Sequence, residues 1–228
     1  MATGVFITLE GGEGSGKSTQ TKVLGDNLRK YFTDHQVVVT REPGGTERAE
    51  NIRQLIVNKT NLPMSPIGQL LLINAAREDH LRAKIIPHLK KGDWVICDRF
   101  IDSTTAYQGY GQGIDLYQIT LLYQLISGSF YPDLTIILDV PKETASSRLI
   151  QRQHTQQKTL SNTDYFESLG SDFHQRVQDG FREIARMNPA RCILLDAEGS
   201  VDEVQKRIID IINKRYALRI QHHSIFTA

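Results

Sequence analysis

One glycine-rich stretch, placed between a strand-like run and a helix-like run, constrains the fold of this chain more than any other feature. It reads GGEGSGKST at residues 11–19 and fits the spacing G-x-x-x-x-G-K-[ST]. Glycines let successive backbone N–H groups turn inward around an anion, and the helix that follows adds its unpaired N-terminal amides. In such a loop the lysine reaches the β- and γ-phosphates of a nucleotide, and the next hydroxyl holds Mg²⁺. We therefore expect a nucleotide phosphate loop rather than an accidental glycine-rich turn, formed by Gly11, Gly12, Glu13, Gly14, Ser15, Gly16, Lys17, Ser18 and Thr19.

Five short runs rich in β-forming residues alternate along the chain with helical patterns. The runs lie at residues 5–10, 36–42, 94–99, 134–140 and 191–197, and most are continuously apolar, as in strands buried on both faces of a parallel sheet. The helical patterns include residues 19–31, 67–90, 116–127, 142–153 and 201–215. This alternation predicts an α/β fold with a doubly wound, five-stranded parallel sheet. No repeat or linker divides the chain, so we expect one domain over residues 1–228.

The charge and composition of the chain argue against some kinds of partner. Its formal net charge is +1, with Lys and Arg spread along the sequence, which gives little support to nucleic-acid or membrane binding. No apolar run approaches the roughly 20 residues that span a bilayer, and the N-terminus lacks a signal-peptide pattern. Cys97 and Cys192 lie in strand-like runs without metal-ligand spacing. We expect buried free thiols in a cytoplasmic protein.

Charged residues close every strand-like run. They are Glu10, Arg41 with Glu42, Asp98 with Arg99, Asp139, and Asp196. Ligands of open parallel sheets bind beyond the carboxyl ends of the strands, so these residues outline a site. Asp139 and Asp196 can be interpreted equally well as helix caps or turn formers.

A polar segment, HTQQKTLSNTD at residues 154–164, follows the helical pattern at 142–153. Arg148 and Arg152 precede it with i, i+4 spacing, so they share one helix face. One interpretation is a solvated basic face. We favour a lid over about residues 148–165, because the segment follows the carboxyl end of the fourth strand.

A phosphate loop alone does not separate a kinase from a regulatory GTPase or a motor protein. The Asn-Lys-x-Asp guanine signature of GTPases is absent from the sequence. Further cationic segments predict a second anionic ligand: TREPGGT (40–46), Arg53, AAR (75–77) and DRF (98–100). Each arginine has an alternative interpretation as an ordinary surface charge, which is weakest for Arg99 because it directly follows a buried strand.

Three of these segments resemble the thymidylate kinase family in order and spacing. They are REPGGT, the AAR triplet, and DRFIDSTTAYQGYGQG (98–113), and the resemblance covers residues 5–215. It implies a P-loop nucleoside monophosphate kinase-like fold with a lid, dTMP and ATP as substrates, and Mg²⁺ as the metal. It also implies direct in-line transfer to dTMP, giving dTDP. A monophosphate with a second pKa near ~6 is already ionised at pH 7, so no general base is needed.

The resemblance assigns roles around the reacting phosphates. Ser18 and Asp98 would hold Mg²⁺, and Arg99 would bridge the donor and acceptor phosphates. The phosphate loop carries no arginine of its own, which resembles the bacterial type, in which lid arginines supply that charge. Arg152 is our first choice for this role, with Arg148 as its neighbour, because Arg152 lies nearer the polar segment.

The resemblance also assigns an acceptor pocket for dTMP. Arg53 and Arg77 would clamp its phosphate or base, and Glu13 would lie near the 3′-hydroxyl. Tyr107 would crowd the 2′ position of the sugar. The remaining positions line the pocket, contact the thymine edge or follow the lid: Glu42, Pro43, Ser103, Thr104, Gln108 and Glu167. Two positions depart from the family pattern. Ile73 stands where a phenylalanine usually stacks on thymine, and Gln112 where many members have arginine.

The helical pattern at 116–127 is apolar around most of its circumference, through Leu116, Ile119, Leu121, Leu122, Leu125 and Ile126. Such a helix needs a second burial surface. Because the family forms homodimers through helices beside the sheet, we expect a homodimer, with burial inside the domain as the alternative. Two other functions stay open: a different nucleoside or nucleotide kinase, and a non-catalytic nucleotide-binding switch. The tail at about 216–228 receives no role.

Overall fold

The computed structural model describes residues 4–57, 64–155 and 165–222, apart from the side chains of residues 152–155 and 167. Its centre is a sheet of five parallel strands. From edge to edge these are β2 (Val37–Arg41), β3 (Trp94–Asp98), β1 (Val5–Gly11), β4 (Leu134–Asp139) and β5 (Cys192–Asp196). All five predicted strands, and the α/β fold class, are confirmed.

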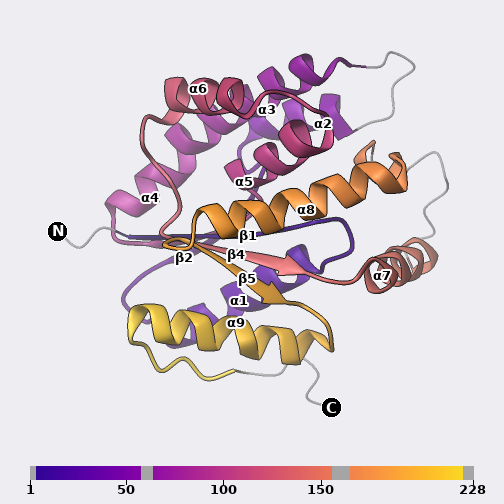
Figure 1. Ribbon diagram of the computed structural model, residues 1–228. Helices are drawn as coiled ribbons and strands as arrows, with labels where there is room; N and C mark the ends of the chain where they lie inside the picture. Colours follow the sequence, from indigo (N-terminus) through magenta and orange to yellow (C-terminus); the bar gives the residue numbers. More distant parts are fainter. Residues whose placement is uncertain (1–3, 58–63, 156–164, 223–228) are drawn as a thin grey trace.

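Helices cover both faces of the sheet (Figure 1). Helices α1 (Lys17–Tyr31) and α9 (Val201–Tyr216) lie on one face, and α3 (Pro66–His80), α6 (Leu116–Ser127) and α8 (Ser171–Met187) lie on the other. Neighbouring strand residues divide between the two layers: Ile7 and Ile96 pack with α1 and α9, whereas Phe6 and Val95 pack with α3 and α6. This division explains why the strands are apolar at consecutive positions.

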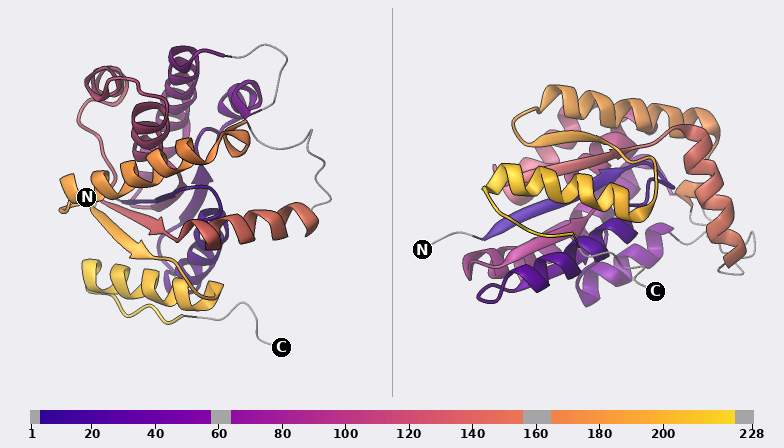
Figure 2. Two further views of the ribbon diagram at one scale, coloured as in Figure 1. Left: turned by 45° about the vertical axis from the view of Figure 1, so that its right-hand side comes forward. Right: turned by 90° about the horizontal axis from the view of Figure 1, so that it is seen from below.

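The predicted helices form, with one subdivision. The pattern at 67–90 is a single continuous helical segment made of α3, a π-helical turn η1 (Leu81–Ile85) and α4 (Ile86–Lys90). Ser65 caps it, because its side chain accepts a hydrogen bond from the Gly68 N–H. Helix α7 (Lys142–Thr155) projects from the carboxyl end of β4 beyond the body of the molecule (Figure 2).

Several helices were not predicted. They are α2 (Glu47–Val57), α5 (Ile101–Thr104), the π-helical η2 (Thr105–Gly111), the short η4 (Phe166–Ser168) and α8. Helix α5 and η2 run on from each other directly after β3, so the DRF segment leads straight into a buried helix.

Cys97 and Cys192 are buried and free, as expected, and burial raises the pKa of both thiols, that of Cys192 to about 12. Within the described residues, no helix combines the length and apolar character that a membrane crossing requires.

Candidate active site

Three glycines of the phosphate loop adopt backbone conformations that other residues avoid. Gly11, Gly14 and Gly16 have φ values of 138°, 74° and 91°, and Gly16 caps α1. A Cβ at Gly11 would lie 2.5 Å from the carbonyl oxygen of Leu138, and one at Gly14 would lie 2.4 Å from that of Ala145. The loop is therefore held tightly between β4 and α7, at the N-terminus of α1, where backbone amides favour an anion.

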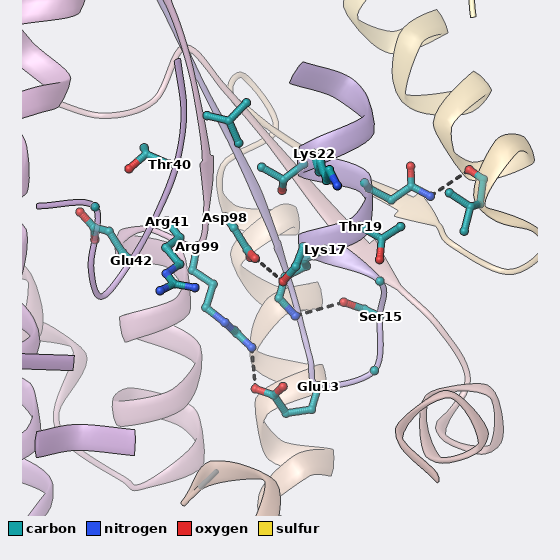
Figure 3. Close-up of a pocket in the computed structure, with 18 of the residues that line it drawn as sticks. Glu13, Ser15, Lys17, Thr19, Lys22, Thr40, Arg41, Glu42, Asp98 and Arg99 are labelled. Atoms are coloured by element: carbon teal, nitrogen blue, oxygen red, sulfur yellow. Dashed lines mark hydrogen bonds and ion pairs between the residues drawn. The ribbon is translucent and has the colours of Figure 1, made fainter. Parts of the chain in front are cut away.

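Lys17 folds back over its own loop (Figure 3). Its ammonium donates to the carbonyl oxygen of Gly12 at 2.6 Å and to the hydroxyl of Ser15 at 3.2 Å. Burial, together with the charge of Arg99, lowers the pKa of Lys17 to about 8. A buried ammonium held over a ring of backbone amides is suited to bind phosphate oxygens. Residues 13–22 line a large pocket around it. The carbonyl oxygens of Gly11 and Gly12 accept hydrogen bonds from Arg99 and Lys17, respectively.

Ser18 and Asp98 meet at the end of β3. The hydroxyl of Ser18 donates to one carboxylate oxygen of Asp98 at 2.5 Å. The other oxygen of Asp98 is buried and has no hydrogen-bond partner among the described residues. Hydroxyl and carboxylate oxygens are ligands that Mg²⁺ prefers, and Mg²⁺ commonly takes its remaining ligands from water and substrate phosphates. Within the described part of the chain no cluster of three or more metal-binding side chains occurs. The pair therefore fits a magnesium ion held jointly with a nucleotide.

Arg99 connects the phosphate loop with the segment after β3. Its guanidinium donates to Glu13 at 2.6 Å, to the hydroxyl of Tyr107 at 3.0 Å, to Ser103 at 3.1 Å and to the carbonyl oxygen of Gly11 at 3.2 Å. The Tyr107 hydroxyl in turn donates to Glu13 at 2.9 Å, and burial keeps its pKa well above the ordinary value. Arg99 has a φ of 70°, in the left-handed region. Non-glycine residues in this region concentrate at functional sites.

A second pocket opens beside the phosphate loop. Among the residues that line it are the predicted acceptor-site residues with described side chains: Glu13, Glu42, Pro43, Arg53, Ile73, Arg77, Arg99, Ser103, Thr104, Tyr107 and Gln108. The side chain of Glu167 lies outside the described residues. Four lining residues were missed: Ile56, Val57, Phe100 and Phe166. Phe100 directly follows the DRF arginine and Phe166 belongs to the YFE segment, so both lay beside residues already selected.

Arg77 and Glu42 form a buried ion pair in this pocket. The Nε of Arg77 lies 2.8 Å from Glu42, and their side chains are 1% and 2% exposed. Arg77 also donates to Thr104 at 2.9 Å and to Asn74 at 3.3 Å. A guanidinium carries five N–H groups. Three are used by these contacts, so two remain without a protein acceptor among the described residues.

Hydrogen bonds, or their absence, locate the other residues that the sequence predicted in or near the acceptor pocket. Arg53 donates to the carbonyl oxygen of Pro43 at 2.9 Å. The side-chain amide nitrogen of Gln108 is buried without a partner in the described part of the chain, so it is a donor available to a ligand. Gln112 lies outside the pocket and donates to Gln69 at 2.8 Å, which joins η2 to α3. The two ambiguous carboxylates, Asp139 and Asp196, line neither pocket.

Both of those carboxylates have structural partners. Asp139 accepts from Gln178 at 2.9 Å and from Arg182 at 3.0 Å, both on α8. Asp196 accepts from the backbone N–H of Glu198 at 2.9 Å. Asp196 therefore forms a turn, as one of the two interpretations expected, whereas Asp139 pairs with side chains of α8 rather than capping a helix.

Arg148, on α7, contacts the phosphate loop. Its guanidinium donates to the carbonyl oxygens of Ala197 at 3.0 Å, Gly199 at 3.1 Å and Ser15 at 3.4 Å. The side chain of Arg152 lies outside the described residues, as do residues 156–164 of the expected lid.

A parallel α/β sheet whose central strand leads into a phosphate loop, with an acceptor-type pocket beside that loop, defines the class of P-loop nucleoside monophosphate kinase folds. The family model described as thymidylate kinase matches residues 9–208. The chain belongs to the thymidylate kinase family.

Individual relatives agree with this assignment over nearly the whole chain. A thymidylate kinase of Caulobacter vibrioides is 44% identical over 218 residues, which cover 96% of this chain and 100% of the relative. A thymidylate kinase of a Marinomonas species is 42% identical, covering 92% and 95%. The crystal structure of thymidylate kinase from Ehrlichia chaffeensis superposes with a TM-score of 0.74 at 36% identity, covering 92% of this chain and 99% of that one.

Proposed function

We propose that the protein transfers the terminal phosphoryl group of ATP directly to the phosphate of dTMP, giving ADP and dTDP. The observation that carries the proposal is the junction of the two pockets, because Glu13, Glu42, Arg53 and Arg99 line both. A triphosphate in the phosphate loop and a monophosphate in the acceptor pocket would meet at Arg99. Membership of the thymidylate kinase family supports the same reaction.

Cations would perform most of the catalysis. In phosphoryl transfer, negative charge spreads over the migrating group, so positioned positive charges stabilise the transition state. Lys17 would hold the β- and γ-phosphates, and Arg99 would contact both substrates. Ser18 and Asp98 would hold Mg²⁺, which would neutralise part of the charge of the phosphates. The unpartnered buried oxygen of Asp98 supports this assignment.

The carboxylates of the acceptor pocket would bind the substrate or hold its other ligands in place, and they would not act as bases. The attacking phosphate of dTMP has a second pKa near ~6 and is already ionised at neutral pH. Glu13 can then serve the 3′-hydroxyl of the sugar, and its hydrogen bonds with Arg99 and Tyr107 fix it for that task. Glu42 is already committed to Arg77 and would hold that arginine in place.

The polar groups of the acceptor pocket complement a thymine edge. Thymine offers two carbonyl acceptors, and the pocket offers the two uncommitted N–H groups of Arg77 and the unpartnered amide of Gln108. Ser103 and Thr104 add hydroxyls beside them. Apolar walls for the ring would come from Ile73, Phe100 and Phe166. Glu167, which follows Phe166, remains a candidate for the same pocket.

We propose that Arg148 and Arg152 supply the charge that the phosphate loop lacks, from a lid over about residues 148–165. Arg148 supports this because it lies against the loop. Arg152 occupies the next turn of α7 on the same face.

We also propose a homodimer, formed through α6 and its neighbours. Ile119 and Tyr123 are the buried residues of α6, whereas Tyr117 is 67% exposed and Leu125 is 83% exposed. Leu71 of α3 and Leu55 of α2 are also exposed. Burial inside the domain therefore does not account for the outer apolar face of α6.

An ADP-release assay with a panel of monophosphates tests the reaction. We expect dTMP to give the fastest ADP release, and we expect Lys17→Ala to lower turnover roughly 100-fold or more with the fold intact. Lys30→Ala, an exposed lysine in the last turn of the same helix that lines neither pocket, is the matched control. Faster release with another monophosphate would identify a different nucleotide kinase. ATP binding without any acceptor-dependent release would indicate a nucleotide-binding switch.

A further inference from the structure

His80 lies behind the acceptor pocket and belongs to neither pocket lining. It is the last residue of α3 and its side chain is 0% exposed. Its Nε2 is 2.7 Å from the hydroxyl oxygen of Thr40 in β2, and its Nδ1 is 3.1 Å from Oε1 of Glu42. The ring therefore joins α3 to the end of β2 through both nitrogens.

The partners of the ring assign its proton. A carboxylate only accepts hydrogen bonds, so Nδ1 carries the proton and donates to Glu42. Nε2 of a neutral ring then accepts from the hydroxyl of Thr40. The contact of Nε2 with Thr40 and that of Nδ1 with Glu42 hold opposite edges of the ring and together fix its orientation.

Each oxygen of Glu42 has a different partner. Oε1 accepts from His80 and Oε2 accepts from Nε of Arg77, which fixes the plane of the carboxylate. The same guanidinium keeps two N–H groups without a protein acceptor among the described residues, and it lines the pocket. Gly45 packs closely against the ring, because a Cβ there would lie 2.3 Å from Nε2, so a residue with a side chain does not fit at position 45.

We propose that His80 is a positioning residue for the acceptor nucleotide: its ring, oriented by Thr40, fixes Glu42 and thereby aims the free N–H groups of Arg77 into the pocket. This rests on the proposed transfer to dTMP. If His80 acts in this way, its loss should affect binding of the acceptor and spare binding of ATP, because it acts through Glu42 on Arg77, which lines the acceptor pocket and not the pocket of the phosphate loop.

Steady-state kinetics with both substrates varied, together with thermal unfolding, test the proposal. His80→Leu fills the space and loses both hydrogen bonds, and we expect it to raise the KM for dTMP roughly tenfold or more while the KM for ATP changes less than about twofold. His80→Asn retains a donor near the position of Nδ1 and should recover most of the loss. His88→Asn is the matched control, because His88 also pairs with a carboxylate, Asp93, at 2.7 Å but lies outside both pockets.

A second variant, Thr40→Val, keeps the proposal testable even if the His80→Leu protein does not fold. Thr40→Val removes only the contact with Nε2, and it should raise the KM for dTMP less than His80→Leu does. Combined with His80→Asn it should add nothing further, since Thr40 acts through the ring. Equal rises in both KM values, no rescue by His80→Asn, or additive effects would each overturn the proposal and leave His80 a structural residue. Failure of the proposed function is a separate result, because wild-type protein would then prefer another monophosphate, and the same variants would be compared on that substrate.

Discussion

At the scale of single residues, Lys17 carries a measurable pH signature. Burial lowers its pKa to about 8, so its ammonium loses its proton as the pH rises through that value. The uncharged amine binds phosphate poorly. The value of kcat/KM for ATP, which reports free enzyme, should therefore fall above pH about 8. The fall of kcat should come at higher pH, because bound phosphates stabilise the charged form. Coincident alkaline limbs in the two profiles would contradict this account.

Tyr107 should act as a rigid steric barrier to ribonucleotides. Its ring packs edge-to-face against that of Phe166, with 5.5 Å between the ring centroids. The ring centroids of Phe173 and Phe181 lie 6.0 Å and 6.2 Å away, so the Tyr107 ring has little freedom to move. We expect UMP to suffer a larger loss of kcat/KM than dUMP, which lacks only the methyl contact, worth ~1–3 kcal/mol at most. Tyr107→Phe keeps the ring and should still exclude UMP. Equal losses for UMP and dUMP in wild type would reject this role.

Most of the acceptor-pocket residues could be predicted because they lie in or near motifs that resemble a family, although Ile56, Val57, Phe100 and Phe166 were missed. His80 could not, because the residues that explain it are distant in sequence: Thr40 and Glu42 are separated from it by 40 and 38 positions. A lone histidine at the end of an apolar helix carries no sign of such partners. The unpartnered oxygen of Asp98 likewise becomes visible only when the packing around β3 is known.

At the scale of elements, the strands were the most predictable part of the molecule. Burial on both faces makes them apolar at consecutive positions, and this pattern is read directly from the sequence. Helix α8 could have been predicted from Phe173, Val177, Phe181 and Ile184, which all lie on one buried face. Helix α5 and η2 could not, because they bury polar residues such as Asp102 and Gln108 and so lack an apolar stripe. The sequence pattern of residues 67–90 continues without a break through the π-helical turn η1, so the turn could not be predicted from it.

Helix α7 should contribute through two arginines with different effects. Arg152→Ala is expected to cut kcat roughly 100-fold, toward the ~10³–10⁵ range of arginine fingers, with little change in the KM for ATP, because an arginine acting in the transition state affects kcat. Arg152→Lys should recover part of it, since one ammonium cannot reproduce the planar fork. Arg148→Ala should instead raise the KM for ATP. The guanidinium of Arg148 donates to Ser15 of the phosphate loop and also to Ala197 and Gly199, so it helps to hold the phosphate loop in place. If both alanine variants keep the wild-type kcat, the two arginines belong to a solvated basic face of α7 and have no catalytic role.

At the scale of the whole molecule, the exposed face of α6 predicts the oligomeric state. Sedimentation at micromolar concentration should give the mass of a dimer. Leu125→Glu places a charge at a position that is 83% exposed in the single chain, so it should shift the mass toward monomer without lowering the unfolding temperature of the domain. Ile150→Glu, an exposed apolar position on α7, is the matched control and should remain dimeric. A monomer mass for the wild-type chain would contradict the dimer.

The ion pair between Arg99 and Glu13 means that the cleft carries its own counter-ion, 2.6 Å from the cation that the two phosphates would share. An arriving anion must displace or share this carboxylate. We expect free phosphate or sulfate, which brings charge alone, to compete poorly with this carboxylate, whereas a nucleotide adds base and sugar contacts on both sides of the junction. The cleft should then bind phosphate groups mainly when they belong to a ligand whose base and sugar are also recognised.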